Sequence, residues 1–600
     1  MRKLSRRSFL AASMAGAAMT GLNWKPVHGR NTGDKPNVVV IVSDDQGWGD
    51  LGIHGNTNLN TPNIDGMAEE GALFEWFYVQ PVCSPTRADL LTGRYFTRSN
   101  VHGTSRGQER MNLGETTIAE SFKAAGYATG CFGKWHGGAQ YPYHPLARGF
   151  DEYYGFCSGH WGQYFDWYLE HNGEWVDYDG YITDDLTTQA MAFMEEQGDD
   201  PFFVYVPYNT PHSPMQVPDE YYDRFDGVDV DMRYQGGQEE DMAMTRAAHA
   251  MNENIDSNVG RIMDKLAELG LDENTILVFL GDNGPNSWRW NGGMRGRKGS
   301  TDEGGVRVPG IIRWARGIRP GQRIKPIAGA IDLLPTLTDL AGIEHVGEAP
   351  LDGVSLKPLL MGETEANDWP DRMIFSCWGQ RVSVRTQRFR LDHEGRLYDM
   401  EADIGQTTDV SEEHPEEAAR LAEAAQQWKD ETFDGYGAAH DDRPFPVGYP
   451  AFPVTHLPAR DGVAHGSIER SNRFPNASFF ENWTEPEDHI SWDIEVNTTG
   501  RYEATVYYTC PEEDVGSTIE LRFGDAAVRS TIETPHDPPL VGAEYDRVPR
   551  MESYVKDFKA KRLGEFKLVA GRGPLTLRAT DIAGEEVMDV RRVTLKLLDA

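Results

Sequence analysis

The feature that most constrains this fold is a set of short apolar runs that end at polar residues. The runs cover residues 37–42, 202–206, 276–280 and 310–314. Continuous apolar stretches of strand length, without polar alternation, are typical of strands that are buried on both faces of a sheet. The four runs are therefore predicted to be buried parallel strands.

Helical patterns lie between these runs. The clearest has apolar residues spaced along one helix face, namely Ile255, Val259, Ile262, Met263, Leu266 and Leu269. Alternating strands and helices predict an α/β fold, with a mainly parallel central sheet flanked by helices on both faces. Ligand sites in such sheets lie at the carboxyl ends of the strands.

Two of the predicted strands end in residues that offer oxygen ligands. Asp44 and Asp45 end the first run, and Asp282 and Asn283 follow the run at 276–280. Three carboxylates and one amide suit a hard divalent cation, calcium or magnesium, and do not suit zinc. Either pair alone would more often be a strand-end turn or a helix cap.

A third pattern is Cys83-Ser84-Pro85-Thr86-Arg87, which is predicted to begin a helix. Pro85 suits the first turn, and the helix can continue to Gly93. The free N–H groups at such a terminus favour an anion, and Arg87 adds a positive charge one turn later. Taken alone, Cys83 could equally be a buried structural cysteine.

The C-x-P-x-R pattern resembles the core motif of the type I, formylglycine-dependent sulfatases of the alkaline-phosphatase-like superfamily. Further segments resemble that family's motifs in the same order: DDQGWGD at 44–50, GKWHG at 133–137, NTPHSP at 209–214, GDNG at 281–284, RGRKGS at 295–300 and EGGVRVP at 303–309. Gly137 replaces the family's usual leucine, which touches neither Lys134 nor His136. The resemblance covers roughly residues 35 to 440.

The resemblance implies a modification, a metal ion and a set of catalytic residues. Cys83 would be oxidised to formylglycine, whose hydrated aldehyde attacks the sulfur of a sulfate ester. One calcium ion per chain, favoured over magnesium, would be bound by Asp44, Asp45, Cys83, Asp282 and Asn283. The implied catalytic residues are Cys83, Arg87, Lys134, His136, His212 and Lys298.

Distinct roles follow for these side chains from the same resemblance. Lys298 and His212 would bind sulfate and help to protonate the departing oxygen, with Asp282 as a candidate base. His136 would assist the release of sulfate, while Arg87 and Lys134 hold the oxygens of the nucleophile.

The remainder of the chain divides by composition. The expected domains are a signal peptide over 1–30, a catalytic α/β domain over 35–360, a small α+β subdomain over 361–440, a proline-rich linker or wrapping segment over 441–470, and a β-sandwich over 471–600. Period-two alternation predicts the sandwich. It weakly resembles carbohydrate-binding jelly rolls, and a packing domain that binds nothing stays equally open.

The first thirty residues resemble a twin-arginine signal. Arg6 and Arg7 precede an apolar run from Phe9 to about Leu22, which is too short to span a bilayer. We therefore expect export by the twin-arginine machinery to the periplasm or beyond, after a formylglycine-generating or sulfatase-maturing enzyme has acted. No later segment is predicted to span a membrane.

Charge excludes one class of partner. The 94 acidic and 58 basic residues give a net charge of -36, which argues against nucleic-acid binding. A sulfated ligand must therefore meet a local basic pocket. The five cysteines show no zinc-like spacing or disulfide framework, although one isolated bridge stays open.

Export together with a β-sandwich favours a sulfated carbohydrate as substrate. The candidate sugar platforms are Trp288-Arg289-Trp290, Tyr143-His144 and His160-Trp161. One alternative is a phosphodiester or phosphonate monoester hydrolase of the same superfamily, and another is a non-catalytic protein that binds sulfated glycans.

Overall fold

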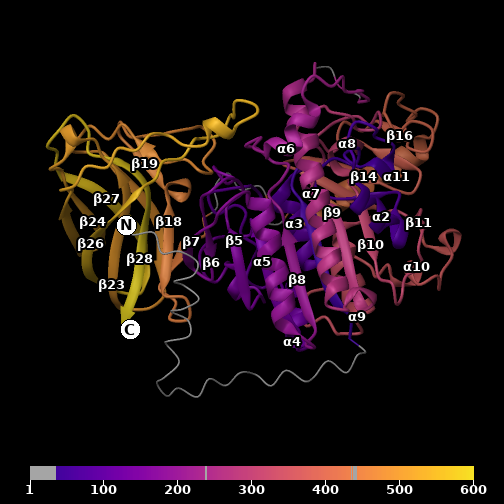
Figure 1. The fold of residues 1–600 in the computed structure, drawn as a ribbon, viewed down its shortest axis with the longest axis horizontal. Helices are drawn as coiled ribbons and strands as arrows, with labels where there is room; N and C mark the ends of the chain where they lie inside the picture. Colours follow the sequence, from indigo (N-terminus) through magenta and orange to yellow (C-terminus); the bar gives the residue numbers. More distant parts are fainter. Residues whose placement is uncertain (1–34, 235, 237–238, 434–435, 437–441, 600) are drawn as a thin grey trace.

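The computed structural model describes residues 35–599, apart from 235, 237–238, 434–435 and 437–441. The predicted signal segment lies outside the described residues. Figure 1 shows an α/β region with a small subdomain on one side and an all-β region on the other. This arrangement confirms the predicted fold class.

A ten-stranded mixed sheet forms the centre of the α/β region, in the order β11-β2-β10-β9-β1-β8-β4-β5-β6-β7. β1 (Asn37–Ser43) lies between β8 (Phe202–Pro207) and β9 (Thr275–Gly281), and both neighbours run parallel to it. β4 (Ala128–Lys134) is parallel to β8. The other strands are β2 (Ala72–Phe74), β5 (Glu152–Phe156), β6 (Tyr168–His171), β7 (Glu174–Asp177), β10 (Gly310–Arg313) and β11 (Gln322–Ile324).

One strand direction differs from the prediction. The run at 310–314 forms β10, but β10 is antiparallel to both β9 and β2. A strand buried on both faces has the same apolar composition in either direction, so the composition could not show which way it runs.

Helices cover both faces of the sheet, and the side chains of β1 alternate between them. Val38, Val40 and Val42 face a core shared with α3 (Cys83–Thr92), α4 (Ile118–Ala124) and α9 (Leu333–Ala341). Val39 and Ile41 face a second core, shared with α2 (Pro62–Glu70), α5 (Ile182–Gln197) and α7 (Met242–Glu268). Smaller elements complete the region: α6 (Asp219–Tyr222), α8 (Glu303–Val306), α10 (Lys357–Leu360), β3 (Phe77–Tyr78) and β12 (Ala328–Gly329).

The small subdomain is an antiparallel sheet covered by one helix. Its strands are β13 (Ile374–Trp378), β14 (Arg381–Arg385), β15 (Phe389–Leu391) and β16 (Leu397–Asp399), and the helix is α11 (Pro415–Thr432). A buried ion-pair cluster joins it to the catalytic domain. The Glu303 carboxylate accepts hydrogen bonds from Arg390 at 2.8 and 3.1 Å and from Tyr78 at 2.9 Å.

Two sheets form the C-terminal β-sandwich. One has the order β17-β22-β27-β24-β25, with β19 paired to β22, and the other β20-β21-β28-β23-β26, with β18 paired to β28. The strands after residue 471 are β21 (Phe480–Glu481), β22 (His489–Val496), β23 (Gly500–Thr509), β24 (Thr518–Phe523), β25 (Ala526–Thr531), β26 (Lys559–Leu568), β27 (Gly571–Asp581) and β28 (Asp589–Asp599).

The segment 441–470, expected to be a linker or wrapping segment, carries four strands of this sandwich. They are β17 (Phe445–Val447), β18 (Val454–Pro458), β19 (Val463–His465) and β20 (Glu469–Arg470). Pro446 and Pro458 lie in β17 and β18, at the margins of the sheets. Proline is tolerated where a strand has a neighbour on one side only, so a proline-rich stretch can still join a sheet.

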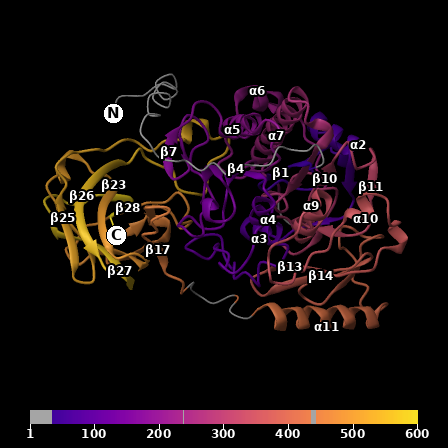
Figure 2. The same ribbon diagram turned by 90° about the horizontal axis from the view of Figure 1, so that it is seen from below.

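A long loop between β25 and β26 leaves the sandwich and meets the catalytic domain, as the gold segment in Figures 1 and 2 shows. We call residues 541–555 the arm. Val541 and Val555 pair with each other and close it at its base.

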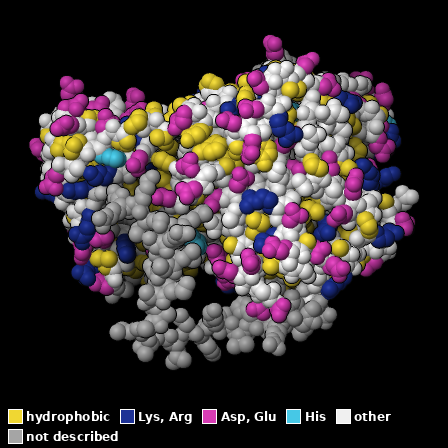
Figure 3. Space-filling view, viewed as in Figure 1, with side chains coloured by type: hydrophobic (Ala, Val, Ile, Leu, Met, Phe, Trp, Pro, Cys, Tyr) yellow, Lys and Arg dark blue, Asp and Glu magenta, His cyan; other side chains and the backbone are white. Residues whose placement is uncertain are grey.

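Acidic side chains are spread over both regions on the face shown in Figure 3, as the net charge requires. In the described part of the chain, no helix is long and apolar enough to cross a membrane. The five cysteines are all buried, and each has a free thiol.

Candidate active site

The carboxyl edge of the central sheet brings the predicted metal ligands together. Asp44 and Asp45 follow β1, while Asp282 and Asn283 follow β9. Cys83 is the first residue of α3, on the same edge. The Cys83 Sγ and carboxylate oxygens of Asp44 and Asp282 lie within 4.8 Å of one another.

Helix α3 holds Cys83 and Arg87 in fixed positions. The helix begins after an extended Val82 and ends at Gly93, whose φ of 66° is left-handed and favours glycine. Arg87 donates to Asp282 Oδ2 from two nitrogens, at 2.9 and 3.2 Å, and to the Lys134 carbonyl at 2.7 Å. The buried guanidinium therefore ties α3 to β4 and β9.

Each aspartate after β1 has a lysine partner. Lys134, the last residue of β4, donates to Asp44. Lys298 Nζ lies 2.6 Å from Asp45 Oδ1, and Asn283 Nδ2 donates to the same oxygen at 2.8 Å. Asp45 has a φ of 68°, and its N–H donates to Asp282 Oδ1 at 3.0 Å.

The pKa values of the carboxyl groups in this cluster are shifted in opposite directions. Burial favours a raised pKa for Asp44, but Lys134, His212 and Arg87 hold that pKa well below its usual value. Burial and the neighbouring Asp44 raise the pKa of Asp282, against the pull of Arg87. Two buried carboxylates this close repel each other, and a divalent cation between them would remove that repulsion.

Two buried oxygens without hydrogen-bond partners in the described part of the chain also support the binding of a divalent cation here. Among the described residues, neither Asp44 Oδ1 nor Asn283 Oδ1 has a hydrogen-bond partner, although both are buried. Buried polar atoms without partners are rare in native proteins and require an explanation. The residues present therefore fit a hard cation.

The two predicted histidines lie in different surroundings. His136 is buried, and its Nε2 donates to the Thr104 carbonyl at 2.9 Å; burial and Lys134 lower its pKa well below the usual value. His212 Nδ1 donates to the Ser213 carbonyl at 2.7 Å, which leaves Nε2 free to point toward Asp45, with Oδ2 at 3.9 Å.

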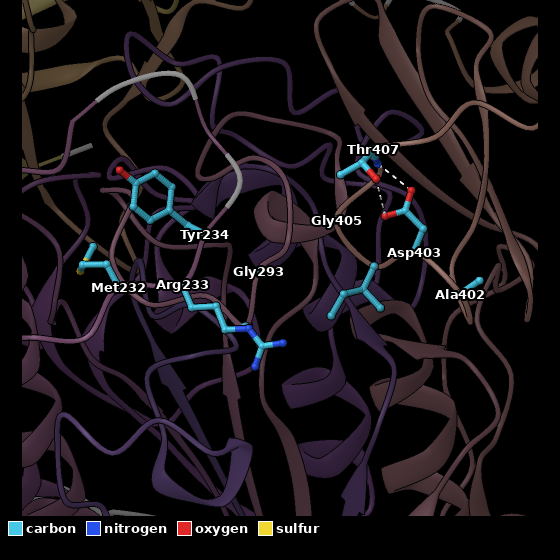
Figure 4. A pocket seen from close by; sticks show the side chains of 10 residues that line it. Met232, Arg233, Tyr234, Gly293, Ala402, Asp403, Gly405 and Thr407 are labelled. Atoms are coloured by element: carbon cyan, nitrogen blue, oxygen red, sulfur yellow. Dashed lines mark hydrogen bonds between the residues drawn. The ribbon is translucent and has the colours of Figure 1, made fainter.

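Lys298 is the most exposed of the basic residues predicted for the site, with 24% of its side chain exposed. It lines a hollow of ≈ 420 Å³ together with Trp288 and Arg297. A second hollow, of ≈ 470 Å³, lies between the catalytic domain and the small subdomain. Figure 4 shows Arg233 and Tyr234 on one wall and Asp403, hydrogen-bonded to Thr407, on the other. The candidate site residues do not line this second hollow.

Most of the predicted sugar platforms are not available for stacking. Trp290 is buried, and Arg289 is buried against Asp50, with nitrogen–oxygen distances of 2.8 and 2.9 Å. Tyr143 and His144 are also buried, and His144 pairs with Glu170 at 2.7 Å. Trp288 is only half-buried and lies 5.1 Å from the Arg297 guanidinium.

Sequence motifs do not indicate that the sandwich approaches this site. Glu552 on the arm accepts a hydrogen bond from Ser213, next to His212, and Asn476 donates to the Thr104 carbonyl that also binds His136. The two contacts join segments that are 339 and 372 residues apart along the chain. A local sequence motif therefore could not indicate them.

Fold and site together define an enzyme of the alkaline-phosphatase-like superfamily. The sulfatase family profile matches residues 36–343, and the chain belongs to the sulfatase family. It is thus a sulfuric ester hydrolase, which confirms the resemblance found in the sequence motifs.

Named relatives agree with this assignment. Mouse N-acetylgalactosamine-6-sulfatase is 33% identical over 387 residues, which cover 58% of this chain and 70% of that protein. Human arylsulfatase A is 34% identical over 373 residues, covering 54% and 68%. The crystal structure of Ps i-CgsB is 29% identical with a TM-score of 0.61, covering 68% of this chain and 95% of that one. The same enzyme in complex with k-i-k-neocarrahexaose gives 0.59 with the same identity and coverage.

Proposed function

We propose that this protein is an exported sulfatase that hydrolyses sulfate esters of carbohydrates, with formylglycine at position 83 and one calcium ion. The observation that carries the proposal is the edge of the central sheet. There Cys83 is the first residue of a helix, and its Sγ lies within 4.8 Å of two carboxylates. Buried cationic side chains surround these carboxylates. An anionic group undergoing transfer needs this concentration of positive charge.

Asp44, Asp45, Asp282, Asn283 and residue 83 would hold the cation, which matches the oxygen ligands that calcium prefers. Once bound, it would polarise the sulfate oxygens and neutralise their charge. Asp44 Oδ1 and Asn283 Oδ1 are the atoms best placed to contribute, because both lack a partner among the described residues.

Modification of Cys83 must precede folding in this proposal. The residue is only 3% exposed, so a formylglycine-generating or sulfatase-maturing enzyme could not reach it in the folded chain. Twin-arginine machinery exports folded proteins, which places maturation and metal uptake in the cytoplasm. The segment that would carry the signal lies outside the described residues.

The basic side chains would divide the work by position. Lys298 and His212, on the more open side, would bind the sulfate and protonate the departing alcohol. Arg87 and Lys134, both fully buried, would hold the oxygens on residue 83. His136, whose pKa is lowered by burial and by Lys134, is neutral and could accept a proton during sulfate release.

Sulfated carbohydrate is the proposed substrate class. The relatives reported above include an enzyme named for a sulfated amino sugar and one solved with a carrahexaose. The acidic surface repels polyanions at long range, so affinity must come from the local cluster of Arg87, Lys134 and Lys298.

The deciding experiment measures turnover of 4-nitrophenyl sulfate and a 4-nitrophenyl phosphodiester by protein made with its maturation enzyme. Preference for the sulfate is expected. Preference for the phosphodiester would favour the phosphoester hydrolase alternative. An unmodified thiol at Cys83 in mass spectra of the native protein, with no turnover, would favour a glycan-binding role.

A further inference from the structure

The arm of the sandwich contacts the segment that carries His212. Glu552 Oε1 accepts a hydrogen bond from Ser213 Oγ at 2.6 Å. The Arg547 N–H donates to the Met215 carbonyl at 3.0 Å, and Gln216 Nε2 donates to the Gly542 carbonyl at 2.8 Å. The arm therefore packs along the residues that directly follow His212.

The arm also closes over the segment around His160. Arg550 donates to the Gly162 carbonyl. A side chain at Gly162 would collide with Val555, since a Cβ there would lie 2.6 Å from a Val555 methyl carbon. Backbone and side chains of the two domains are therefore in close contact here, two residues along the chain from His160.

His160 is buried beside the candidate site and is not used by the proposed reaction. It is 4% exposed, and its ring lies 5.7 Å from that of His212. Among the described residues, neither of its ring nitrogens has a hydrogen-bond partner. Burial lowers the pKa of His160 to about 3, although Glu552 opposes the shift, so the neutral ring offers one donor and one acceptor.

Glu552 has a free acceptor at the same place. Its Oε2 is buried and has no hydrogen-bond partner in the part of the chain that the structure describes. Burial alone would raise the pKa of Glu552, but the facing imidazoles of His160 and His212 and the Ser213 hydroxyl hold it below its usual value, so the group is a carboxylate. Within the described residues, polar atoms without partners on two neighbouring side chains, the ring nitrogens of His160 and Oε2 of Glu552, indicate a missing polar ligand.

We propose that His160 and Glu552 form a subsite that binds hydroxyl groups of the sugar ring whose sulfate is removed, so that the sandwich supplies part of the substrate pocket. The inference rests on the proposed function and adds to it the groups that recognise the sugar. Sugar hydroxyls both donate and accept hydrogen bonds, which matches a carboxylate beside a neutral imidazole.

The charge of Glu552 makes the subsite selective. A carboxylate accepts hydrogen bonds from a hydroxyl but repels a second sulfate. Sites built to bind a hydroxyl discriminate strongly against ligands that lack one, because their buried polar groups are then unpaired. The preferred substrate therefore carries a free hydroxyl next to the cleaved ester.

The test compares Glu552→Ala with the unaltered full-length enzyme on 4-nitrophenyl sulfate and three sugars. The sugars are galactose 6-sulfate, N-acetylgalactosamine 6-sulfate and N-acetylglucosamine 6-sulfate. Loss of a hydrogen bond to a charged group should lower kcat/KM for the best sugar by about 10- to 100-fold. Turnover of 4-nitrophenyl sulfate, which has no sugar hydroxyls, should change by less than about 3-fold. Glu487→Ala, at an exposed position of the same sandwich, is the control and should change neither.

Two companion variants separate recognition from folding. Glu552→Gln keeps the shape of the side chain and should reduce discrimination against N-acetylgalactosamine 4,6-disulfate relative to the 6-sulfate. Ser213→Ala removes the hydrogen bond to Glu552 but leaves the carboxylate, and it should retain most of the sugar activity.

The outcomes distinguish the subsite from the proposed function. Equal losses on aryl and sugar sulfates, or no loss on either, would overturn the subsite. An unaltered enzyme that cleaves 4-nitrophenyl sulfate but none of the three sugars would also overturn it, while leaving the sulfatase assignment in place. Failure of the modified, calcium-loaded enzyme on every sulfate would instead refute the proposed function.

Discussion

Substitution of Glu303 by glutamine tests whether the buried ion-pair cluster holds the small subdomain to the catalytic domain. Glu303 is fully buried and contacts three guanidinium groups. Arg390 donates to it at 2.8 and 3.1 Å, while Arg307 and Arg385 lie 3.6 and 3.8 Å away. Glu303→Gln keeps the volume but leaves three buried cations without their anion.

Breaking a buried pair by removing one partner costs about 3–5 kcal/mol. Since 1.36 kcal/mol corresponds to a factor of ten, opening of this junction should become roughly 10²- to 10⁴-fold more frequent. Hydrogen exchange measured by mass spectrometry on peptides covering 301–310 and 381–391 reports that opening. Glu412→Gln, at an exposed position, should leave the exchange unchanged.

The effect should depend on pH in a defined direction. Burial favours a raised pKa for Glu303, but Arg390, Arg385 and Arg307 hold it below the usual 4.5. A lowered carboxyl pKa contributes stability above 4.5, and that stability is lost as the pH falls through the folded-state value. The difference between the unaltered protein and Glu303→Gln should therefore shrink below about pH 4.5. A change of less than tenfold at neutral pH, or a difference that grows in acid, would refute the reasoning.

Three further predictions concern the site. Cys83→Ala should abolish sulfate turnover without changing the circular dichroism spectrum, and substantial residual activity would contradict the assignment of residue 83. Removal of metal with EGTA should reduce both turnover and the thermal midpoint, with calcium restoring both more fully than magnesium; unchanged behaviour after exhaustive chelation would argue against a metal at Asp44. Trp288→Ala should raise KM for sulfated oligosaccharides but not for 4-nitrophenyl sulfate, whereas the buried Trp290→Ala should lower stability by about 3–5 kcal/mol. Equal KM values for the Trp288 variant and the unaltered enzyme would exclude that residue as a platform.

Much of the fold could be predicted because apolar periodicity is a local signal. The strands at 37–42, 202–206 and 276–280 and the amphipathic helix that includes Ile255 all follow from side-chain spacing. The direction of β10 and the strands within 441–470 did not, since pairing partners far along the chain decide them.

The candidate site was predicted to a similar extent, and for a related reason. Asp44, Asp282 and Cys83 meet because strand ends and a helix start share one edge of the sheet, which motifs can indicate. The packing of loops and domains decides that the buried Arg289 donates to the Asp45 carbonyl and that Glu552 approaches Ser213. The chemical type of one residue does not show which distant residue it will contact.

The contact between the arm and the catalytic domain also has a consequence for how the chain is made. Ser213 and Glu552 are separated by 339 residues. At synthesis rates of about 5–20 residues per second, roughly 20 to 70 s pass between the synthesis of Ser213 and that of Glu552. The carboxyl edge of the central sheet can form during that interval, but the contact of the arm with the segment after His212 cannot. Chains released early by truncation would therefore carry a catalytic domain whose pocket lacks one side, and they should be open to proteolysis at residues 213–219.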